Sequence, residues 1–420
     1  MHRESNERIV IIALVALQLI GLLLVATLLL PLIGRWHGLD LQIYYIAALR
    51  LLRGELPYRD FPLEYPPLAL LPFALPQLLA FGRRLNFLSY VWLFVIQNAL
   101  FSTLIALALA RIVALARPAY SYARVLGLYA LLIAVCAPLA PWRYDLFPAL
   151  LTILALLAVV TGRPALAGIW LGLGIAAKLY PLVLVPVVGA YYLAGRRYRA
   201  LAGLLLGSIG ATALVLVPYI LLDPQGPLTF VRYHQLRGLQ IESLPAGAII
   251  LAHVLGLTQA GMVFNYGALH LVSPLAEAVL GWVLPAAALA FGLVLASCLG
   301  HFMAERSAGD TIAIESLAAY MMAALLTFLA TNKVLSPQYI IWLLPFAPLL
   351  RPWQAITALV IVTLTIVLFP FAYEQFLAMQ PAPVLLLNVR NALIAGLLGW
   401  LLVMYRPSGA HVAGGHPVRA

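Results

Sequence analysis

The chain has 420 residues, of which 64% are hydrophobic and only 9% are charged. This composition excludes a water-soluble protein of this length, so lipid must be the solvent for most of the chain. The formal net charge of +11 does not indicate nucleic acid, because arginines at the cytoplasmic ends of membrane helices produce the same excess. The two cysteines, Cys136 and Cys298, lie inside apolar runs and indicate neither a disulfide framework nor a metal site.

The apolar runs are continuous rather than alternating, which predicts membrane-spanning helices and not a β-barrel. A hydrocarbon core about 30 Å thick needs roughly 20 apolar residues per crossing. On this scale the chain is an all-α polytopic membrane protein with about twelve transmembrane helices. The predicted crossings are 9–33, 87–110, 124–141, 146–161, 165–177, 180–195, 201–222, 274–299, 311–330, 335–350, 353–372 and 384–404.

Two N-terminal segments need separate treatment. The run 9–33 is too long for a signal-peptide core and has no convincing cleavage site, so we count it as the first helix. The apolar stretch 66–82 is short and contains four prolines, and we predict an interfacial or re-entrant helix there.

The arginines predict the orientation of the bundle. With twelve crossings, the basic loops fall on the side of the N-terminus, which the positive-inside rule identifies as cytoplasmic. We therefore expect one integral domain over 1–420 in the plasma membrane, with both termini cytoplasmic and 405–420 as a short tail. The residues that mark this side are Arg111, Arg117, Arg124, Arg163, Arg196, Arg197, Arg199, Arg306, Arg351 and Arg406.

The opposite face carries two long segments, 34–86 and 223–272, in which carboxylates, cations and aromatic residues are mixed. Loops of this length in a compact protein are usually functional or disordered, and these contain too many Tyr, Leu and Pro residues to be disordered. We predict interfacial helices in 34–86 and an active site on this face.

Asp40 follows the first helix and precedes an amphipathic stretch. It either caps that stretch as an N-cap residue or serves as a general base at the membrane interface. Further along, Arg143 and Asp145 either form an ordinary ion pair, with each other or with a neighbour, or belong to the site.

Several cations interrupt apolar runs. Lys178 and Lys333 each separate two apolar segments, and each is followed by a proline three or four residues later. Ionisable groups at such depth are typical of functional sites, and broken helices place cations and backbone dipoles around anions, although a lysine can also extend its ammonium to the interface. We predict that one phosphate is surrounded by Arg143, Lys178, Arg237, Lys333 and Arg390.

The order of short motifs resembles glycosyltransferase family 87, within the GT-C fold of polyprenyl-phosphate-sugar-dependent glycosyltransferases. Asp40 with Tyr44-Tyr45 is followed by Gly54-x-x-Pro57-Tyr58, Tyr65-Pro66-Pro67-Leu68, Lys178-x-x-Pro181 and Ser336-Pro337-x-Tyr339. The resemblance implies an inverting transfer of a sugar, with mannose as the commonest, from a polyprenyl-phosphate donor to a lipid or glycan acceptor on the extracytoplasmic face.

The resemblance also implies that Asp40 is the catalytic base. No cofactor is certain, although related enzymes of this fold can use a divalent metal. The sequence shows no close cluster of carboxylates for such a metal, and Glu64 is the candidate to join Asp40 in a metal site. The predicted substrate contacts are Tyr44, Tyr58, Asp60, Glu64, Tyr65, His234, Glu242 and Tyr339.

The main alternative is a transporter or flippase of an anionic lipid-linked substrate, which would also use broken helices and buried lysines. It accounts less well for polar residues gathered on one face. A purely structural membrane protein would not concentrate ionisable residues within apolar segments.

Overall fold

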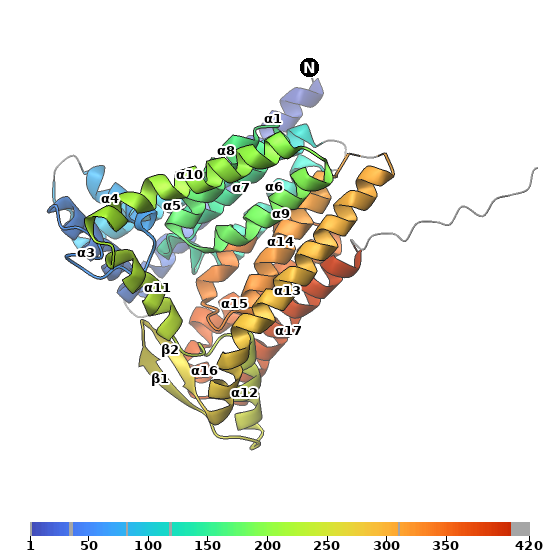
Figure 1. Ribbon diagram of the computed structural model, residues 1–420. Coiled ribbons are helices and arrows are strands. Elements are labelled where there is room, and N and C mark those ends of the chain that lie inside the picture. Colours follow the sequence, from blue (N-terminus) through green and yellow to red (C-terminus); the bar gives the residue numbers. More distant parts are fainter. Residues whose placement is uncertain (1, 33–36, 81–82, 117–119, 310, 405–420) are drawn as a thin grey trace, which may run out of the picture.

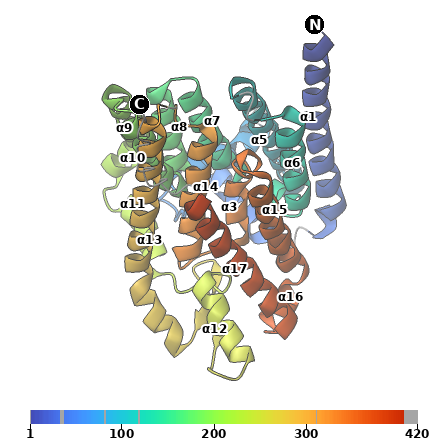
Figure 2. The same ribbon diagram turned by 90° about the vertical axis from the view of Figure 1, so that its right-hand side faces the viewer.

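The computed structural model describes residues 2–32, 37–80, 83–116, 120–309 and 311–404. The predicted tail 405–420 lies outside these ranges, as do residues 34–36 of the first outer segment. The described chain is mainly helical, which confirms the all-α polytopic class (Figures 1 and 2).

Seven helices in the described part of the chain are long and apolar enough to cross a membrane. All seven coincide with predicted crossings. They are α1 (His2–Leu29), α5 (Phe87–Leu115), α10 (Tyr198–Leu222), α13 (Pro274–Ser307), α14 (Ile314–Thr331), α15 (Pro352–Ile366) continued by the π-helical turn η7 (Val367–Phe371), and α17 (Pro381–Met404).

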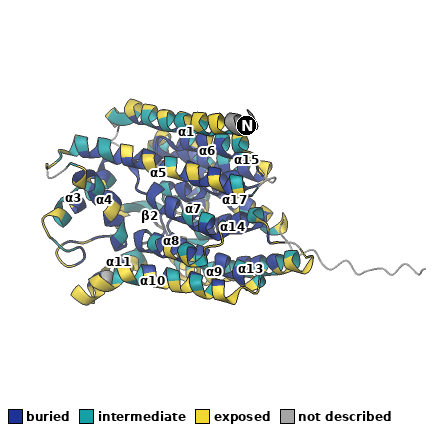
Figure 3. Cartoon of the chain, turned by 90° about the horizontal axis from the view of Figure 1, so that it is seen from above, coloured by how far each residue is buried: buried dark blue, intermediate teal, exposed yellow. Residues whose placement is uncertain are grey.

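Four further predicted crossings form shorter apolar helices. These are α6 (Tyr122–Cys136), α7 (Leu146–Val160), α8 (Pro164–Ala177), and the 3-10 turn η4 (Tyr180–Val183) that leads into α9 (Leu184–Ala194). A 15-residue helix is only about 22 Å long, which is shorter than the hydrocarbon core of a bilayer, about 30 Å thick. Helix α7 is buried on nearly all sides, whereas α1, α10 and α13 expose apolar side chains along their outer faces, as the burial colours show (Figure 3).

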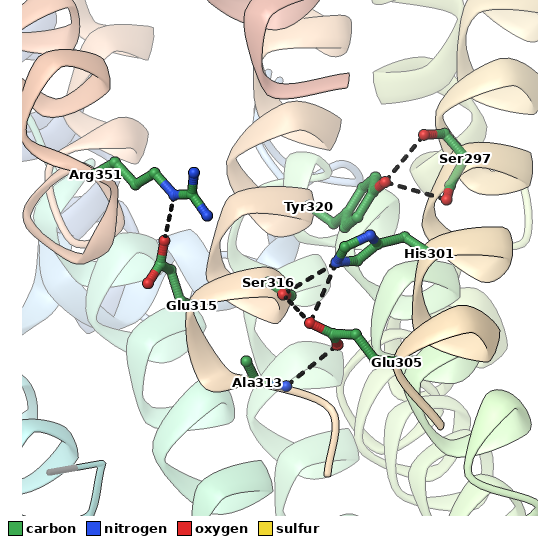
Figure 4. A network of polar contacts seen from close by, with 8 residues as sticks. All are labelled: Ser297, His301, Glu305, Ala313, Glu315, Ser316, Tyr320 and Arg351. Atoms are coloured by element: carbon green, nitrogen blue, oxygen red, sulfur yellow. Dashed lines mark hydrogen bonds and ion pairs between the residues drawn. The ribbon is translucent and has the colours of Figure 1, made fainter. Parts of the chain in front are cut away.

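The prediction of a transmembrane helix over 335–350 was wrong in kind. This segment forms two buried 3-10 helices, η5 (Pro337–Leu343) and η6 (Ala347–Leu349). Prolines at 337, 345 and 348 remove backbone donors at close intervals, so the hydrogen-bond ladder of an α-helix cannot form. The segment still returns to the start of α14, where Arg351 Nε donates to Glu315 Oε1 at 2.9 Å (Figure 4).

The hairpin of α13 and α14 is closed by polar contacts at the same end (Figure 4). Ser316 Oγ donates to Glu305 Oε1 at 2.7 Å, and His301 Nε2 lies 3.3 Å from the same oxygen. Glu305 Oε2 accepts from the backbone N–H of Ala313 at 3.3 Å. These bonds satisfy the helix ends and fix where α14 begins.

Shorter elements gather at the other end of the bundle, away from the N-terminus (Figure 1). They comprise η1 (Leu30–Leu32), α3 (Gly38–Leu52), η2 (Pro67–Ala69), α4 (Leu70–Leu78), η3 (Ala140–Trp142), α11 (Gly226–Leu236), α12 (Leu244–Val254), β1 (Gly261–Asn265), β2 (Ala268–Val272) and α16 (Tyr373–Leu377). Helix α4 is too short to span a bilayer, in agreement with the interfacial or re-entrant helix expected there. It is bound to α5, where Tyr90 and Gln97 donate to the backbone oxygens of Phe73 and Pro72, each at 3.0 Å.

The β-hairpin was not predicted. Strands β1 and β2 are antiparallel, with Asn265 opposite Ala268. Tyr266 and Gly267 form the two-residue turn, and both have positive φ (45° and 68°), as a type I′ turn requires. Leu239 and Ile241 exchange backbone bonds with Leu271 and Leu269 across the other edge of β2. The hairpin thereby fixes the segment that follows α11.

Helices α8 and α10 make the closest helix contact in the bundle through small residues. A Cβ atom added at Gly168 would lie 2.1 Å from Leu204 O, one at Gly172 2.3 Å from Ser208 O, and one at Gly207 2.3 Å from Ala165 O. Membrane helices often use this spacing of small residues because they gain packing contacts when backbones approach. The contact fixes the position of α8, and Lys178 lies at the C-terminal end of that helix.

We predict that Gly172→Ala destabilises the protein by about 1–3 kcal/mol, because the new methyl group meets backbone atoms that cannot move independently. Gly210→Ala on the facing helix is the matched control, since a Cβ there meets nothing within 4 Å. Thermal unfolding of both variants in detergent checks this. Equal melting temperatures for the two would contradict the close packing of α8 on α10.

Candidate functional site

A cavity of about 540 Å³ lies among the shorter elements at the end of the bundle away from the N-terminus. Its size suits a drug-sized polar ligand. Four cations and three carboxylates contribute to its lining, together with a group of aromatic rings. The charged lining residues are Asp40, Glu64, Arg143, Lys178, Arg237, Glu242 and Lys333.

Asp40 lies in the first turn of α3, which His37 precedes as N-cap without a side-chain capping bond. Asp40 is therefore not the N-cap residue, so that interpretation was wrong. Its Oδ2 forms a close ion pair with Nη1 of Arg143, whose side chain is buried. Arg143 thus pairs with Asp40 and not with Asp145, and it fixes one oxygen of the carboxylate of Asp40, which lines the cavity.

Asp145 forms a second buried pair. Its Oδ1 accepts from Lys178 Nζ at 2.6 Å and from Trp342 Nε1 at 2.7 Å. Lys178 follows the last residue of α8 and occupies its C-cap position. The lysine is thus held by a carboxylate at the broken helix, and does not extend to the interface.

Aromatic rings surround the Lys178 ammonium. Its Nζ lies 4.7 Å from the ring centroid of Tyr144 and 5.4 Å from those of Tyr339 and Trp342. Tyr339 and Trp342 stack at 4.1 Å because side chains three residues apart eclipse each other on a 3-10 helix. Tyr180 stacks on the other face of Trp342 at 4.1 Å. The 3-10 form of η5 is therefore what builds this cage.

Lys333 and Arg237 differ from the first two cations. Lys333 Nζ donates to the backbone oxygens of Gln235 (2.7 Å) and Arg237 (2.6 Å), which places a positive charge at the C-terminal end of α11. The Arg237 guanidinium lies 5.9 Å from the Tyr233 ring centroid. In the described part of the chain, neither residue has a carboxylate within ion-pair distance.

Glu64 is fixed by two adjacent residues of α11. The Tyr233 hydroxyl donates to Glu64 Oε2 at 2.6 Å, and His234 Nε2 lies 3.1 Å from the backbone oxygen of Glu64. Burial, together with the charges of Arg237, Lys178 and Lys333, lowers the pKa of His234 to about 4. The ring is therefore neutral at pH 7, and its Nε2 carries the hydrogen because a carbonyl only accepts.

Glu242 lies on a more enclosed part of the lining. Its side chain is buried, and Oε1 accepts from the Tyr373 hydroxyl at 2.8 Å. Burial raises the pKa of Glu242, an effect that the hydroxyl of Tyr373 and the charge of Arg390 oppose.

The predicted residues separate into two groups. Those that line the cavity are Asp40, Glu64, Tyr65, Arg143, Lys178, His234, Arg237, Glu242, Lys333 and Tyr339. Four others lie outside the lining. Arg390 is buried behind it and donates to the backbone oxygen of Glu242 at 3.0 Å.

The remaining three lie in the segment 34–86. Tyr44 is buried and stacks on Phe73 at 4.2 Å. The Tyr58 hydroxyl donates to Tyr65 O at 2.5 Å. Asp60 is exposed in an ion pair with Arg59, which lowers the pKa of its carboxyl. These residues shape the segment around Tyr65.

Sequence reasoning missed several lining residues. Tyr180 and Trp342 gave a usable signal, since Tyr180 lies directly before Pro181 and Trp342 lies five residues after Pro337, each within an interrupted apolar run. Phe264, Tyr266, Phe369 and Tyr373 reach the cavity from the unpredicted hairpin and from the η7–α16 corner, and no local pattern marks them. Within the described ranges, no group of three His, Cys, Asp or Glu side chains is arranged to hold a metal ion.

The fold and the cavity define a multi-pass helical membrane protein with a charged site at one end of its bundle. The chain matches the model of glycosyltransferase family 87 over residues 63–331, more than half of its length, and it belongs to that family. The protein is therefore a glycosyltransferase. The match includes Glu64, Arg143, Lys178 and Arg237, while Asp40 precedes it. A search of curated proteins finds no match.

Two histidines, His234 in the cavity lining and the buried His270 on β2, predict acid lability. Burial, with Arg237 and Lys333, also lowers the pKa of His270 to about 4. In the unfolded chain these histidines take up protons near pH 6.5, whereas in the folded protein they do so only near pH 4. The stability of the folded protein is therefore complete above pH 6.5 and falls as the pH decreases towards 4. His270→Gln should therefore lessen the fall in melting temperature between pH 7 and pH 5. An unchanged fall would contradict the lowered pKa.

Proposed function

We propose that this glycosyltransferase moves a sugar from a polyprenyl-phosphate donor to the hydroxyl of a lipid or glycan acceptor, with inversion at the anomeric carbon. The observation that carries the proposal is a single cavity that holds both a carboxylate, Asp40, and two cations without carboxylate partners, Arg237 and Lys333. Mannose is the first sugar to test.

The chemistry assigns a part to each group. Asp40 takes the proton of the acceptor hydroxyl as its oxygen bonds to the anomeric carbon. The bond from that carbon to the phosphate oxygen breaks, and its electron pair stays on the phosphate. The phosphate therefore gains one negative charge, which Arg237 and Lys333 stabilise. The ion pair with Arg143 holds the Asp40 carboxylate in position.

The proposed orientation places the cavity on the extracytoplasmic face of the plasma membrane. Helix α8 has Arg163 as its N-cap residue and Lys178 as its C-cap residue, so one helix length separates an arginine-bearing end from the cavity. The positive-inside rule favours a cytoplasmic location for the arginine end. A donor with a polyprenyl tail would then remain in lipid while its phosphate enters the cavity.

Asp40→Asn should lower kcat by about 10²- to 10⁴-fold while binding of the donor is kept, because the amide cannot take the proton. The assay is transfer from polyprenyl-phosphate mannose in lipid nanodiscs to a panel of lipid and glycan acceptors. Asp40→Glu keeps the charge beside Arg143 and serves as the stability control. Asp223→Asn, which removes a carboxylate outside the cavity lining, should leave the rate unchanged.

Full transfer activity in a folded Asp40→Asn protein would refute the role of Asp40. If the wild type binds the donor but transfers sugar to no acceptor or water, and instead moves the donor between leaflets, the transporter alternative replaces the proposal.

Arg237→Gln and Lys333→Gln should each weaken binding of a short-chain prenyl monophosphate about tenfold or more, since each removes a charge-assisted contact. Isothermal titration in nanodiscs measures this, with the matching prenyl alcohol as the uncharged ligand. Arg232→Gln is the matched control, because Arg232 lies exposed on α11 outside the lining. Equal affinities in all three variants would place the phosphate elsewhere.

A further inference from the structure

Two carboxylates of the cavity, Glu64 and Glu242, have no cation within ion-pair distance in the described ranges, and Glu64 is the less buried of the two. Asp40 is paired with Arg143, whereas in the described ranges no Lys, Arg or His nitrogen lies within ion-pair distance of Glu64. Glu64 is half-buried and lines the same cavity as the cations. A carboxylate in that place repels a phosphate, so a part of the ligand with a different chemistry must face it.

The hydrogen bonds of Glu64 leave one oxygen available. Oε2 accepts from the Tyr233 hydroxyl at 2.6 Å, while Oε1 has no bond to a described residue. The contact with Tyr233 therefore fixes the carboxylate and leaves Oε1 to accept from a ligand. Gly267 packs beside this pair, since a Cβ there would lie 3.1 Å from the Tyr233 hydroxyl and 3.5 Å from Glu64 Oε2.

His234 adds a second acceptor next to Glu64. Its Nε2 donates to the backbone oxygen of Glu64 at 3.1 Å, so Nδ1 of the neutral ring has a lone pair and no hydrogen. His234 also lines the cavity. Glu64 and His234 thus each offer an acceptor atom on the lining of one cavity, which matches a ligand that presents hydroxyl groups.

We propose that Glu64 and His234 form a hydroxyl-binding subsite that recognises the sugar part of a substrate and sets its specificity, with Tyr233 as the residue that positions Glu64. The ligand class is a neutral polyol. The hydroxyls belong either to the donor sugar or to the acceptor glycan, and this choice of source is the part that rests on the proposed function.

Binding tests the subsite without catalysis. Saturation-transfer NMR on the protein in nanodiscs measures the affinity of methyl glycosides of hexoses and pentoses, and titration measures that of a prenyl monophosphate. Glu64→Gln should weaken the best glycoside about tenfold, whereas the monophosphate binds equally well or more tightly because a negative charge has been removed. Tyr233→Phe should weaken the same glycoside to a smaller extent.

The opposite signs separate recognition from mere loss of structure, which would weaken both ligands. Glu277→Gln is the matched control, because Glu277 is exposed in the first turn of α13 and does not line the cavity. Unchanged glycoside affinity in a folded Glu64→Gln protein would overturn the subsite. This outcome is independent of the Asp40 variants, which test the transfer reaction.

Kinetics then distinguishes the two sources. If the donor sugar occupies the subsite, Glu64→Gln raises the KM for the donor and slows its hydrolysis by water. If the acceptor occupies it, only the KM for the acceptor rises and hydrolysis is unchanged. If neither KM changed, the assignment of Glu64 to substrate recognition would be overturned.

Discussion

The site depends on two buried ion pairs that share one short stretch of chain. Arg143 pairs with Asp40, and Asp145 pairs with Lys178. A charge removed from water is costly unless a partner and further hydrogen bonds compensate it, so each of these residues requires its partner in place. The pairs join α3, the start of α7, the end of α8 and, through Trp342, the 3-10 helix η5.

The same pairs determine which cations remain available to a ligand. Two of the four cavity cations are neutralised within the protein, so the uncompensated charge lies at Arg237 and Lys333. An anionic group is therefore attracted more strongly at the end of α11 than beside the ion-paired Asp40.

Much of this arrangement follows from local sequence, and the rest does not. Continuous apolar runs predicted eleven of the helices, and lysines beside prolines marked both breaks that reach the cavity. The 3-10 form of 335–350 was not predicted, because hydropathy does not report which backbone donors prolines remove. The pairing of Arg143 with Asp40 joins residues about a hundred positions apart, and it depends on the tertiary contact of α3 with the turn between η3 and α7, where Tyr44 meets Tyr144 at 5.7 Å.

Helix α11 connects the two chemical halves of the cavity. Its residues Tyr233 and His234 hold Glu64, while its C-terminal end receives the Lys333 ammonium beside Arg237. Most of its side chains are exposed, and Phe230 is its one buried apolar anchor in the described part of the helix. Helix α11 links the position of the Glu64 carboxylate to that of the Arg237 and Lys333 charges. A substrate bound as proposed, with hydroxyls at Glu64 and a phosphate at Arg237 and Lys333, would contact groups that this one helix connects.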